Sequence, residues 1–370
     1  MPRLISAAQL QKHDCTMNVR VLLPAHLTAD QIAAWSLMQT EDPALDSPFF
    51  RPEFTRCVAM VRDDVEVAAL EDAGRPVGFF PYQRDRGDIG RPVGGYMSDF
   101  QGLILTAGHE CSPRDLIHSC RLRAWHFDHV LTSQARFQPY HWLTASSPYM
   151  DVSRGFDAYL ASRCNQDSNQ LKQMLRKIRK AQREIGPVRY EAYCTARDVL
   201  NTLIAWRVDQ YRRIKVINYL QPRWTRDLLD SLLALRDDNF RGVLNALYIG
   251  DRLAAARFAL QGRGVLHSWI MAYDASLAKY SPGSMLLVET ARSAQSVGIQ
   301  RIDLGKGEER YKQQYMSGAT PVAEGSIDLR PMTSAIRRRW SSACELVRAS
   351  AFRAPAQYVI RNARAWWLYR

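Results

Sequence analysis

The sequence predicts a duplicated α/β fold with two units, each built on a central mixed sheet, and a basic helical tail behind them. One observation is the length of 370 residues, which exceeds the usual size of a single domain. A second is that the order helix, strand, turn, strand occurs in both halves. A third is an apolar-x-Pro-x-aromatic-Thr-Arg motif at 50–56 that returns at 220–226, so that Pro52 and Pro222 are 170 positions apart.

In the first half, residues 19–24 read as a short strand, and Thr28 or Asp30 is placed to cap a helix through residues 32–37. Strands at 65–70 and 77–82 flank a turn in which Gly74 supplies a positive φ angle. These segments predict an antiparallel pair. The first unit, a degenerate copy, is assigned to residues 19–150.

In the second half, helical periodicity covers 196–214 and 227–235. Strands are predicted at 243–249, 253–260 and 265–273. This order repeats that of the first half. The second unit is assigned to residues 151–330 and the tail to residues 331–370.

Composition excludes several classes of protein. Hydrophobic residues make up 46% and charged residues 24%, which are ordinary globular values. The chain start lacks the apolar core of a signal peptide, so we expect a cytoplasmic protein. The seven cysteines are scattered without a CxxC pair, and no conventional metal-ligand spacing occurs, so we expect no disulfide framework and no metal. No GxSxG, Walker or kinase motif is present.

The segment 280–285, Tyr-Ser-Pro-Gly-Ser-Met, joins the strand at 265–273 to a helix. Free amides at that helix start would point towards an anion, and Gly283 allows close backbone approach. A pyrophosphate is therefore a candidate ligand. A plain N-terminal helix cap is the alternative. The residues predicted to bind the cofactor are Tyr280, Ser281, Pro282, Gly283, Ser284 and Met285.

A second informative segment follows at 298–312, where a helix ends at Gly298 and a buried strand carries Ile302 and Leu304. A turn with two glycines follows at 305–307, and the segment after it carries Glu308, Tyr311 and Lys312. Together, 280–287 and 303–312 resemble the CelD-like, cellulose-biosynthesis-type acetyltransferases of the GNAT superfamily. The likeness covers residues 156–329 strongly and the first copy weakly, and the layout is also similar to that of the FemAB-like aminoacyltransferases.

That resemblance implies tandem GNAT-like domains, acetyl-CoA or another acyl-CoA as co-substrate, and work in exopolysaccharide or adhesin biosynthesis. The acceptor would be a sugar, a nucleotide-sugar or a lipid-linked saccharide. The sequence departs from the family at the pyrophosphate loop Arg/Gln-x-x-Gly-x-Gly/Ala, because only residues 281–284 stand in its place. The donor therefore stays open among CoA, an acyl carrier protein and a charged tRNA, the last as in FemAB-like enzymes.

Acyl transfer from a thioester needs a base for the acceptor amine or hydroxyl and a donor to the developing oxyanion, and a tyrosine could protonate the leaving thiolate. His267 is the first candidate base because its ordinary pKa is near neutrality, with a hydrogen-bonded strand histidine as the alternative. Asp303 and Glu308 are further candidate bases, and Tyr311 is a candidate acid. Each could instead have a structural role. The residues predicted to contact substrate are Gly305, Gly307 and Lys312.

The chain carries a formal net charge of +13, and one basic cluster lies in the tail. Arg337, Arg338 and Arg339 are predicted to contact an anion, either the inner membrane or a cyclic dinucleotide. A basic amphipathic helix pair packed on the body is the alternative. The competing function class is therefore a non-catalytic effector that binds a nucleotide or a membrane.

Overall fold

The computed structural model describes residues 17–165 and 170–330, so the predicted tail and Arg337–Arg339 lie outside the described residues. In these residues all strands belong to one 13-stranded sheet. Twelve of them follow the order β1-β2-β3-β4-β6-β13-β7-β12-β11-β10-β9-β8, and β5 pairs with β3 beside this path. No helix in the described residues has the length and apolar character needed to cross a bilayer.

The first half of the chain starts with the edge strand of the sheet and two helices. Thr28 caps α1 and exchanges hydrogen bonds with Gln31 in a capping box. The elements are, in chain order, β1 (Asn18–Leu22), α1 (Ala29–Glu41), α2 (Pro52–Ala59), β2 (Val65–Asp72), β3 (Arg75–Asp85), β4 (Ile89–Arg91), β5 (Ile104–Leu105), α3 (Pro113–Ser119), β6 (Ala124–Leu131) and β7 (His141–Asp151).

The second half repeats this order after two connecting helices. Its elements are α4 (Phe156–Asn165), α5 (Gln170–Glu184), β8 (Val188–Glu191), α6 (Arg197–Arg213), α7 (Arg223–Ala234), β9 (Arg241–Ile249), β10 (Arg252–Gln261), β11 (Val265–Tyr273), α8 (Pro282–Ser293), β12 (Arg301–Asp303), α9 (Arg310–Tyr315) and β13 (Gly318–Asp328). The predicted hairpins are present, and both Gly74 and Gly250 have positive φ angles in their turns.

The repeated proline motif occupies equivalent places in the two halves. Pro52 is the first residue of α2, which precedes β2, and Pro222 caps α7, which precedes β9. A proline fits at a helix start because the first turn has no intrahelical use for its N–H. Thr55 and Thr225, three residues later, are both buried. The motif therefore marks the same turn of each unit.

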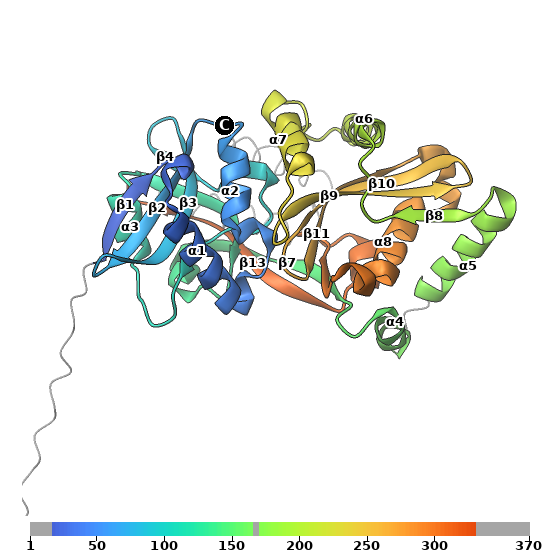
Figure 1. The fold of residues 1–370 in the computed structure, drawn as a ribbon, viewed down its shortest axis with the longest axis horizontal. Helices are drawn as coiled ribbons and strands as arrows, with labels where there is room; N and C mark the ends of the chain where they lie inside the picture. Colours follow the sequence, from blue (N-terminus) through green and yellow to red (C-terminus); the bar gives the residue numbers. More distant parts are fainter. Residues whose placement is uncertain (1–16, 166–169, 331–370) are drawn as a thin grey trace, which may run out of the picture.

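The two units exchange their last strands at the middle of the sheet. The first strand of each unit, β1 or β8, lies at an outer edge of the sheet. Towards the middle of the sheet each unit has one parallel pair of strands, β4 with β6 in the first unit and β11 with β12 in the second. β13 then pairs with β6, β7 pairs with β12, and β7 and β13 pair with each other. In Figure 1, β7 and β13 run between the two halves. The predicted boundary at 150/151 falls at the end of β7.

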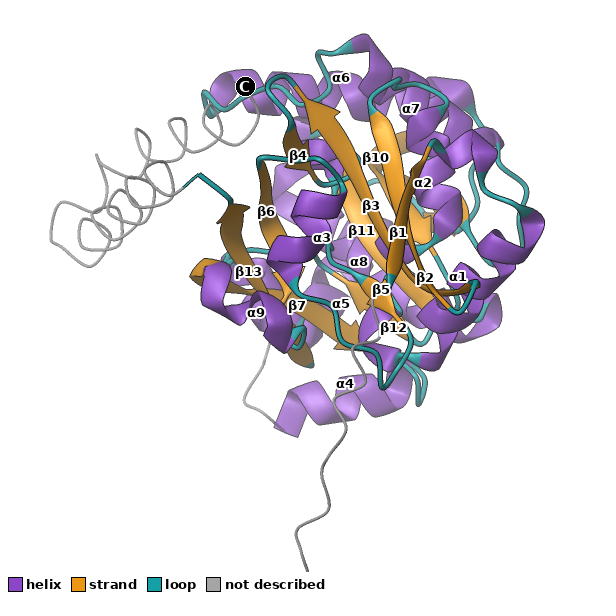
Figure 2. Cartoon of the chain, turned by 90° about the vertical axis from the view of Figure 1, so that its left-hand side faces the viewer, coloured by secondary structure: helices purple, strands orange, loops and turns teal. Residues whose placement is uncertain are grey.

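The helices cover both faces of this sheet. One face carries α1, α2, α6 and α7, and their apolar side chains form a single core that draws on both units. Figure 2 shows these helices along one side of the strands. On the opposite face, α5 and α8 cover the second unit and α3 covers the first. Because one core serves both units, they pack as one body and can share a site.

Candidate functional site

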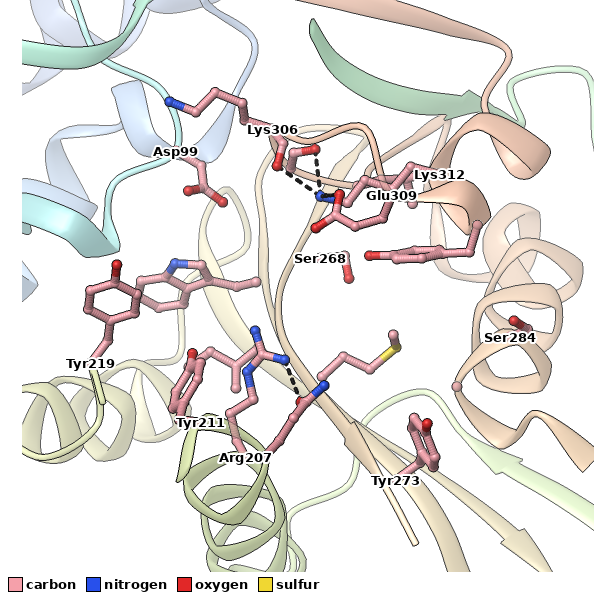
Figure 3. Close-up of a pocket in the computed structure, with 18 of the residues that line it drawn as sticks. Asp99, Arg207, Tyr211, Tyr219, Ser268, Tyr273, Ser284, Lys306, Glu309 and Lys312 are labelled. Carbon is pink, nitrogen blue, oxygen red and sulfur yellow. Dashed lines mark hydrogen bonds and ion pairs between the residues drawn. The ribbon is translucent and has the colours of Figure 1, made fainter. Parts of the chain in front are cut away.

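A cleft of about 670 Å³ opens where β11 and β12 separate. The two strands pair in parallel only at Val265–Arg301, Leu266–Ile302 and His267–Asp303. From Ser268 onward β11 leaves β12, and residues 268–271 line the cleft together with residues 304–306. The cleft runs from the start of α8 to a loop of the first unit that contains Tyr96, Met97 and Asp99. In Figure 3, Ser284 and Asp99 mark these two ends.

The end formed by α8 contains part of the predicted cofactor loop. Ser281, Gly283 and Ser284 line the cleft. Ser281 has a left-handed backbone with φ of +59°, and its carbonyl accepts the amides of Ser284 at 3.0 Å and Met285 at 3.1 Å. Pro282 has no N–H. Within the described chain, Gly283 therefore carries the first-turn amide that remains available to a ligand.

One cation stands beside this helix start. The Lys177 ammonium, from α5, donates to Ser281 Oγ at 2.8 Å. A positive charge beside a free amide at a helix N-terminus favours an anion there. The other three predicted loop residues lie elsewhere: Pro282 and Met285 are buried, and the buried Tyr280 donates through its hydroxyl to Glu184 Oε2 at 2.6 Å.

The opposite end of the cleft holds a carboxylate, Asp99. It comes from the first unit, just after the short 3₁₀ turn Gly95–Met97, and points into the cleft in Figure 3. Its Oδ2 lies 2.7 Å from His267 Nε2. Burial acts to raise the pKa of Asp99, but the hydrogen bond and charge of His267 outweigh burial and hold this pKa below its usual range. Asp99 is therefore ionised at neutral pH.

His267 lies behind Asp99 and does not reach the cleft. Its side chain is 0% exposed, and its Nδ1 is 3.7 Å from Asp303 Oδ2. Burial acts to lower the pKa of His267, but Asp303 and Asp99 outweigh burial and raise it to about 9. The imidazole is therefore a buried cation between two carboxylates.

A guanidinium extends this row of charges. Arg301 Nε donates to Asp303 Oδ1 at 2.9 Å, and Arg301 Nη2 donates to Asp46 Oδ1 at 2.6 Å. Burial acts to raise the pKa of Asp303, but His267 and Arg301 outweigh burial and lower it. Charges thus alternate from the cleft inward, and each buried ion has an opposite neighbour.

The segment after β12 forms one wall of the cleft. Gly305 lines it with φ of +74°, and a Cβ at this position would lie 3.3 Å from Asp99 Oδ2. Lys312 also lines it, but its ammonium donates to the carbonyls of Gly305 at 3.1 Å and Lys306 at 2.9 Å and pairs with Glu309 at 3.1 Å. All three of its protons are engaged, so Lys312 holds this wall in shape.

The remaining predicted residues divide between the cleft and other places. Tyr311 lines the cleft, and burial raises its pKa to about 12, so its hydroxyl stays protonated at neutral pH. Gly307 lies outside the cleft lining, at a φ of +147°. Glu308 is exposed and also lies outside it. Of the four predicted catalytic residues, Tyr311 alone lines the cleft, while His267 and Asp303 act on it through Asp99.

Aromatic side chains line the cleft near Asp99. The rings of Tyr96 and Tyr219 stack with centroids 4.7 Å apart, and Tyr211 meets Tyr219 edge-on at 5.9 Å. Arg207 lies over the Tyr211 ring at 4.7 Å and donates to Gln210 Oε1 at 2.7 Å. All five residues line the cleft. This end therefore offers flat apolar faces beside polar groups.

Sequence reasoning missed Asp99 and this aromatic wall. Tyr96 and Asp99 follow the Gly94-Gly95 pair in the first unit, while Tyr211 and Tyr219 flank the end of α6 in the second. The glycine pair was the one local sign of an unusual loop.

In the described residues, no group of three or more His, Cys, Asp or Glu is arranged to hold a metal ion.

Comparison with known proteins finds a family match over the part of the chain that contains most of the cleft lining. Residues 168–313 match the family model of the acetyltransferase (GNAT) domain. A search of curated protein sequences finds no match to this chain. The domain match confirms the prediction of an acyltransferase, and GNAT domains use acyl-CoA.

Solved structures share the whole fold at low sequence identity. FemX is 9% identical with a TM-score of 0.54, covering 86% of this chain and 99% of its own. The C-terminal domain of a protein assigned as a lysylphosphatidylglycerol synthetase from Agrobacterium fabrum is 11% identical with a TM-score of 0.51, covering 83% and 93%. A Bacteroides thetaiotaomicron protein of unknown function is 10% identical with a TM-score of 0.52, covering 81% and 97%. These likenesses and the duplicated topology confirm the predicted tandem GNAT-like fold.

Proposed function

We propose that this protein transfers an acyl group, with acetyl as the first candidate, from acyl-CoA to a sugar, nucleotide-sugar or lipid-linked saccharide used in exopolysaccharide biosynthesis. The observation that carries the proposal is the ionised Asp99 in a cleft between the α8 start and an aromatic wall. The resemblance to CelD-like acetyltransferases supports the saccharide acceptor. The proposed location is the cytoplasm, with peripheral association at the inner membrane through the basic tail.

The donor would lie along the α8 end of the cleft. Its phosphate groups would meet the Gly283 amide and the Lys177 ammonium, which together offer a donor hydrogen bond and a positive charge. The thioester would then extend along residues 268–271 of β11, where that strand has left β12. Peptide groups on an unpaired strand edge can bind an extended ligand that carries amides.

The acceptor would lie against the aromatic wall, with its reacting amine or hydroxyl at Asp99. Sugar rings present apolar C–H faces and polar edges, and a surface with flat aromatic rings, Arg207 and Gln210 fits both. Asp99 takes the acceptor's proton as its nitrogen or oxygen bonds to the thioester carbon. The carbon–sulfur bond then breaks, and Tyr311 protonates the leaving thiolate. His267 keeps Asp99 ionised and oriented.

The test is thiol release and product mass when the protein is given acetyl-CoA with a panel of amino sugars, nucleotide-sugars and lipid-linked saccharides. We expect turnover with at least one acceptor. Asp99→Asn should lower kcat by about a hundredfold or more, since general-base catalysis contributes factors of this order. Asp115→Asn is the matched control, because Asp115 is exposed on α3 and does not line the cleft.

Each alternative function has its own outcome in this assay. Binding of a nucleotide or a membrane without turnover would support the non-catalytic effector. Transfer from aminoacyl-tRNA in place of acetyl-CoA would support a FemAB-like aminoacyltransferase. Unchanged turnover in Asp99→Asn would refute the proposed role of Asp99 while leaving the acyltransferase assignment in place.

A further inference from the structure

Helix α5 presents a straight row of cations to solvent. Lys172, Arg176, Arg179 and Arg183 are all exposed and follow one another at spacings of four, three and four residues. Such spacings place side chains on one helix face, over a length of roughly 16 Å. We call these four residues the α5 stripe. Within the described part of the chain, no ion pair connects the α5 stripe to a carboxylate.

The α5 stripe has a fixed position relative to the cleft. The opposite face of α5 is apolar, and Leu171, Met174, Ile178 and Ala181 are buried in the core beneath α8. On the flank of the same helix, Lys177 reaches Ser281 at the start of α8. Ser281 lines the donor end of the cleft, so a partner that lies along the α5 stripe docks on the helix that also supplies Lys177 to that entrance.

The donor end of the cleft offers few contacts for a nucleotide. Of the first-turn groups of α8, the Gly283 amide alone is available in the described chain, and Lys177 supplies the adjacent charge. The standard glycine-rich pyrophosphate loop of the family has no counterpart in residues 281–284. Affinity for a donor would therefore gain from contacts outside the cleft, and the α5 stripe is the charged surface beside it.

The chemistry of α5 favours carboxylates over nucleic-acid bases. Residues 170–184 contain no aromatic side chain, although stacking on aromatic rings is a main source of affinity for unpaired bases. Cations at helical spacing match carboxylates at the same spacing on a facing helix. The surface therefore fits the acidic helix of a protein.

We propose that the α5 stripe docks an acidic carrier protein that presents the acyl group as a thioester on a flexible arm, with the arm entering the cleft at Ser281. This inference rests on the proposed acyltransferase function and names a class of donor for it. Docking holds the carrier outside the cleft, and Asp99 and Tyr311 perform the same transfer as with acyl-CoA. The reaction releases the carrier with a free thiol on its arm.

The experiment compares acetyl-loaded bacterial acyl carrier protein with acetyl-CoA as donors, using an acceptor that supports turnover. The variant Arg176→Glu/Arg179→Glu/Arg183→Glu reverses three charges of the α5 stripe. Its matched control is Arg75→Glu/Arg86→Glu/Arg114→Glu, which changes the net charge equally at exposed sites of the first unit. We expect the stripe variant to lose about 10-fold to about 100-fold in kcat/KM with the carrier and less than about twofold with acetyl-CoA.

Salt provides a second measurement. Raising the ionic strength from about 0.05 M to about 0.3 M should slow the carrier reaction of the unaltered protein and of the control, but not that of the stripe variant, because screening acts on exposed charges. A carrier reaction no faster than that of acetyl-pantetheine would overturn the proposal, as would equal losses with both donors.

The result with acetyl-CoA separates this proposal from the function on which it rests. If acetyl-CoA supports transfer and the carrier does not, the carrier proposal fails and the acyltransferase proposal stands. If aminoacyl-tRNA supports transfer and the stripe variant loses that activity, the surface binds nucleic acid and the carrier proposal also fails. If none of these donors supports transfer, both proposals fail together.

Discussion

The buried charge of His267 should make the stability of this protein fall as the pH rises above neutrality. The pKa of His267 is raised from 6.5 to about 9 in the folded protein. A raised pKa stabilises the fold while the imidazole is charged, so the contribution is fully present below pH about 6.5 and is lost as the pH passes about 9. A shift of this size corresponds to about 3 kcal/mol of unfolding free energy.

The perturbation is His267→Gln, which cannot titrate but keeps an N–H that can donate to Asp99. Urea denaturation followed by tryptophan fluorescence, at several pH values from about 6 to about 9.5, gives the unfolding free energy of both proteins. The difference between the unaltered protein and the variant should change by about 3 kcal/mol across this range, in favour of the variant at high pH. Asp303→Asn should move the loss of stability to lower pH, because it removes one of the carboxylates that raise the His267 pKa.

Two results would refute this reasoning. If the curves of the unaltered protein and His267→Gln stay parallel within about 0.5 kcal/mol from pH 6 to pH 9.5, His267 is not a buried cation. If Asp303→Asn titrates like the unaltered protein, the carboxylate at 3.7 Å does not act on the imidazole.

Two further predictions concern the two ends of the cleft. Gly283→Val should weaken donor binding, measured by calorimetry, about tenfold or more with little change in Tm, because a side chain there projects towards Met271 and Tyr273. A Cβ alone would lie 3.5 Å from each of these two side chains, so Gly283→Ala should have a smaller effect. Normal acetyl-CoA binding by folded Gly283→Val would exclude the α8 start as the donor site. Tyr219→Ala should raise the acceptor KM about fivefold and leave donor affinity unchanged, because it removes the ring that stacks with Tyr96 at 4.7 Å. A rise in the donor KM alone would place the acceptor elsewhere.

The elements that the sequence predicted well depend on local chemistry. Hairpin turns with glycine, the proline motif at helix starts and the Ser-Pro-Gly segment are each specified within about ten residues, and all occur in the structure at the predicted places. His267 and Asp303 were selected separately as candidate bases. The parallel pairing of β11 with β12 sets them opposite each other.

The Asp99 end of the cleft could not be predicted because it depends on contacts between distant parts of the chain. Asp99 meets His267 across 168 positions, and Trp269 Nε1 donates to the Met97 carbonyl at 2.8 Å across 172 positions. No periodicity or motif near Asp99 indicates a partner in the other unit. Glu308, by contrast, has the chemistry of a base, but the turn that carries it leaves it exposed outside the cleft.

The exchange of β7 and β13 explains why the site needs both units. β7 follows the first unit in sequence but pairs with β12, whose residue Asp303 contacts His267. Cutting the chain at 150/151 would therefore separate β12 of the second unit from its partner β7, and β6 of the first unit from its partner β13. The loop with Asp99 is held over the second unit by Trp269 and His267, and Gly305 gives it room. In the proposed mechanism, the second unit thus supplies the donor end and the first supplies the carboxylate that faces the acceptor, so a single unit would bind a donor without a base to use it.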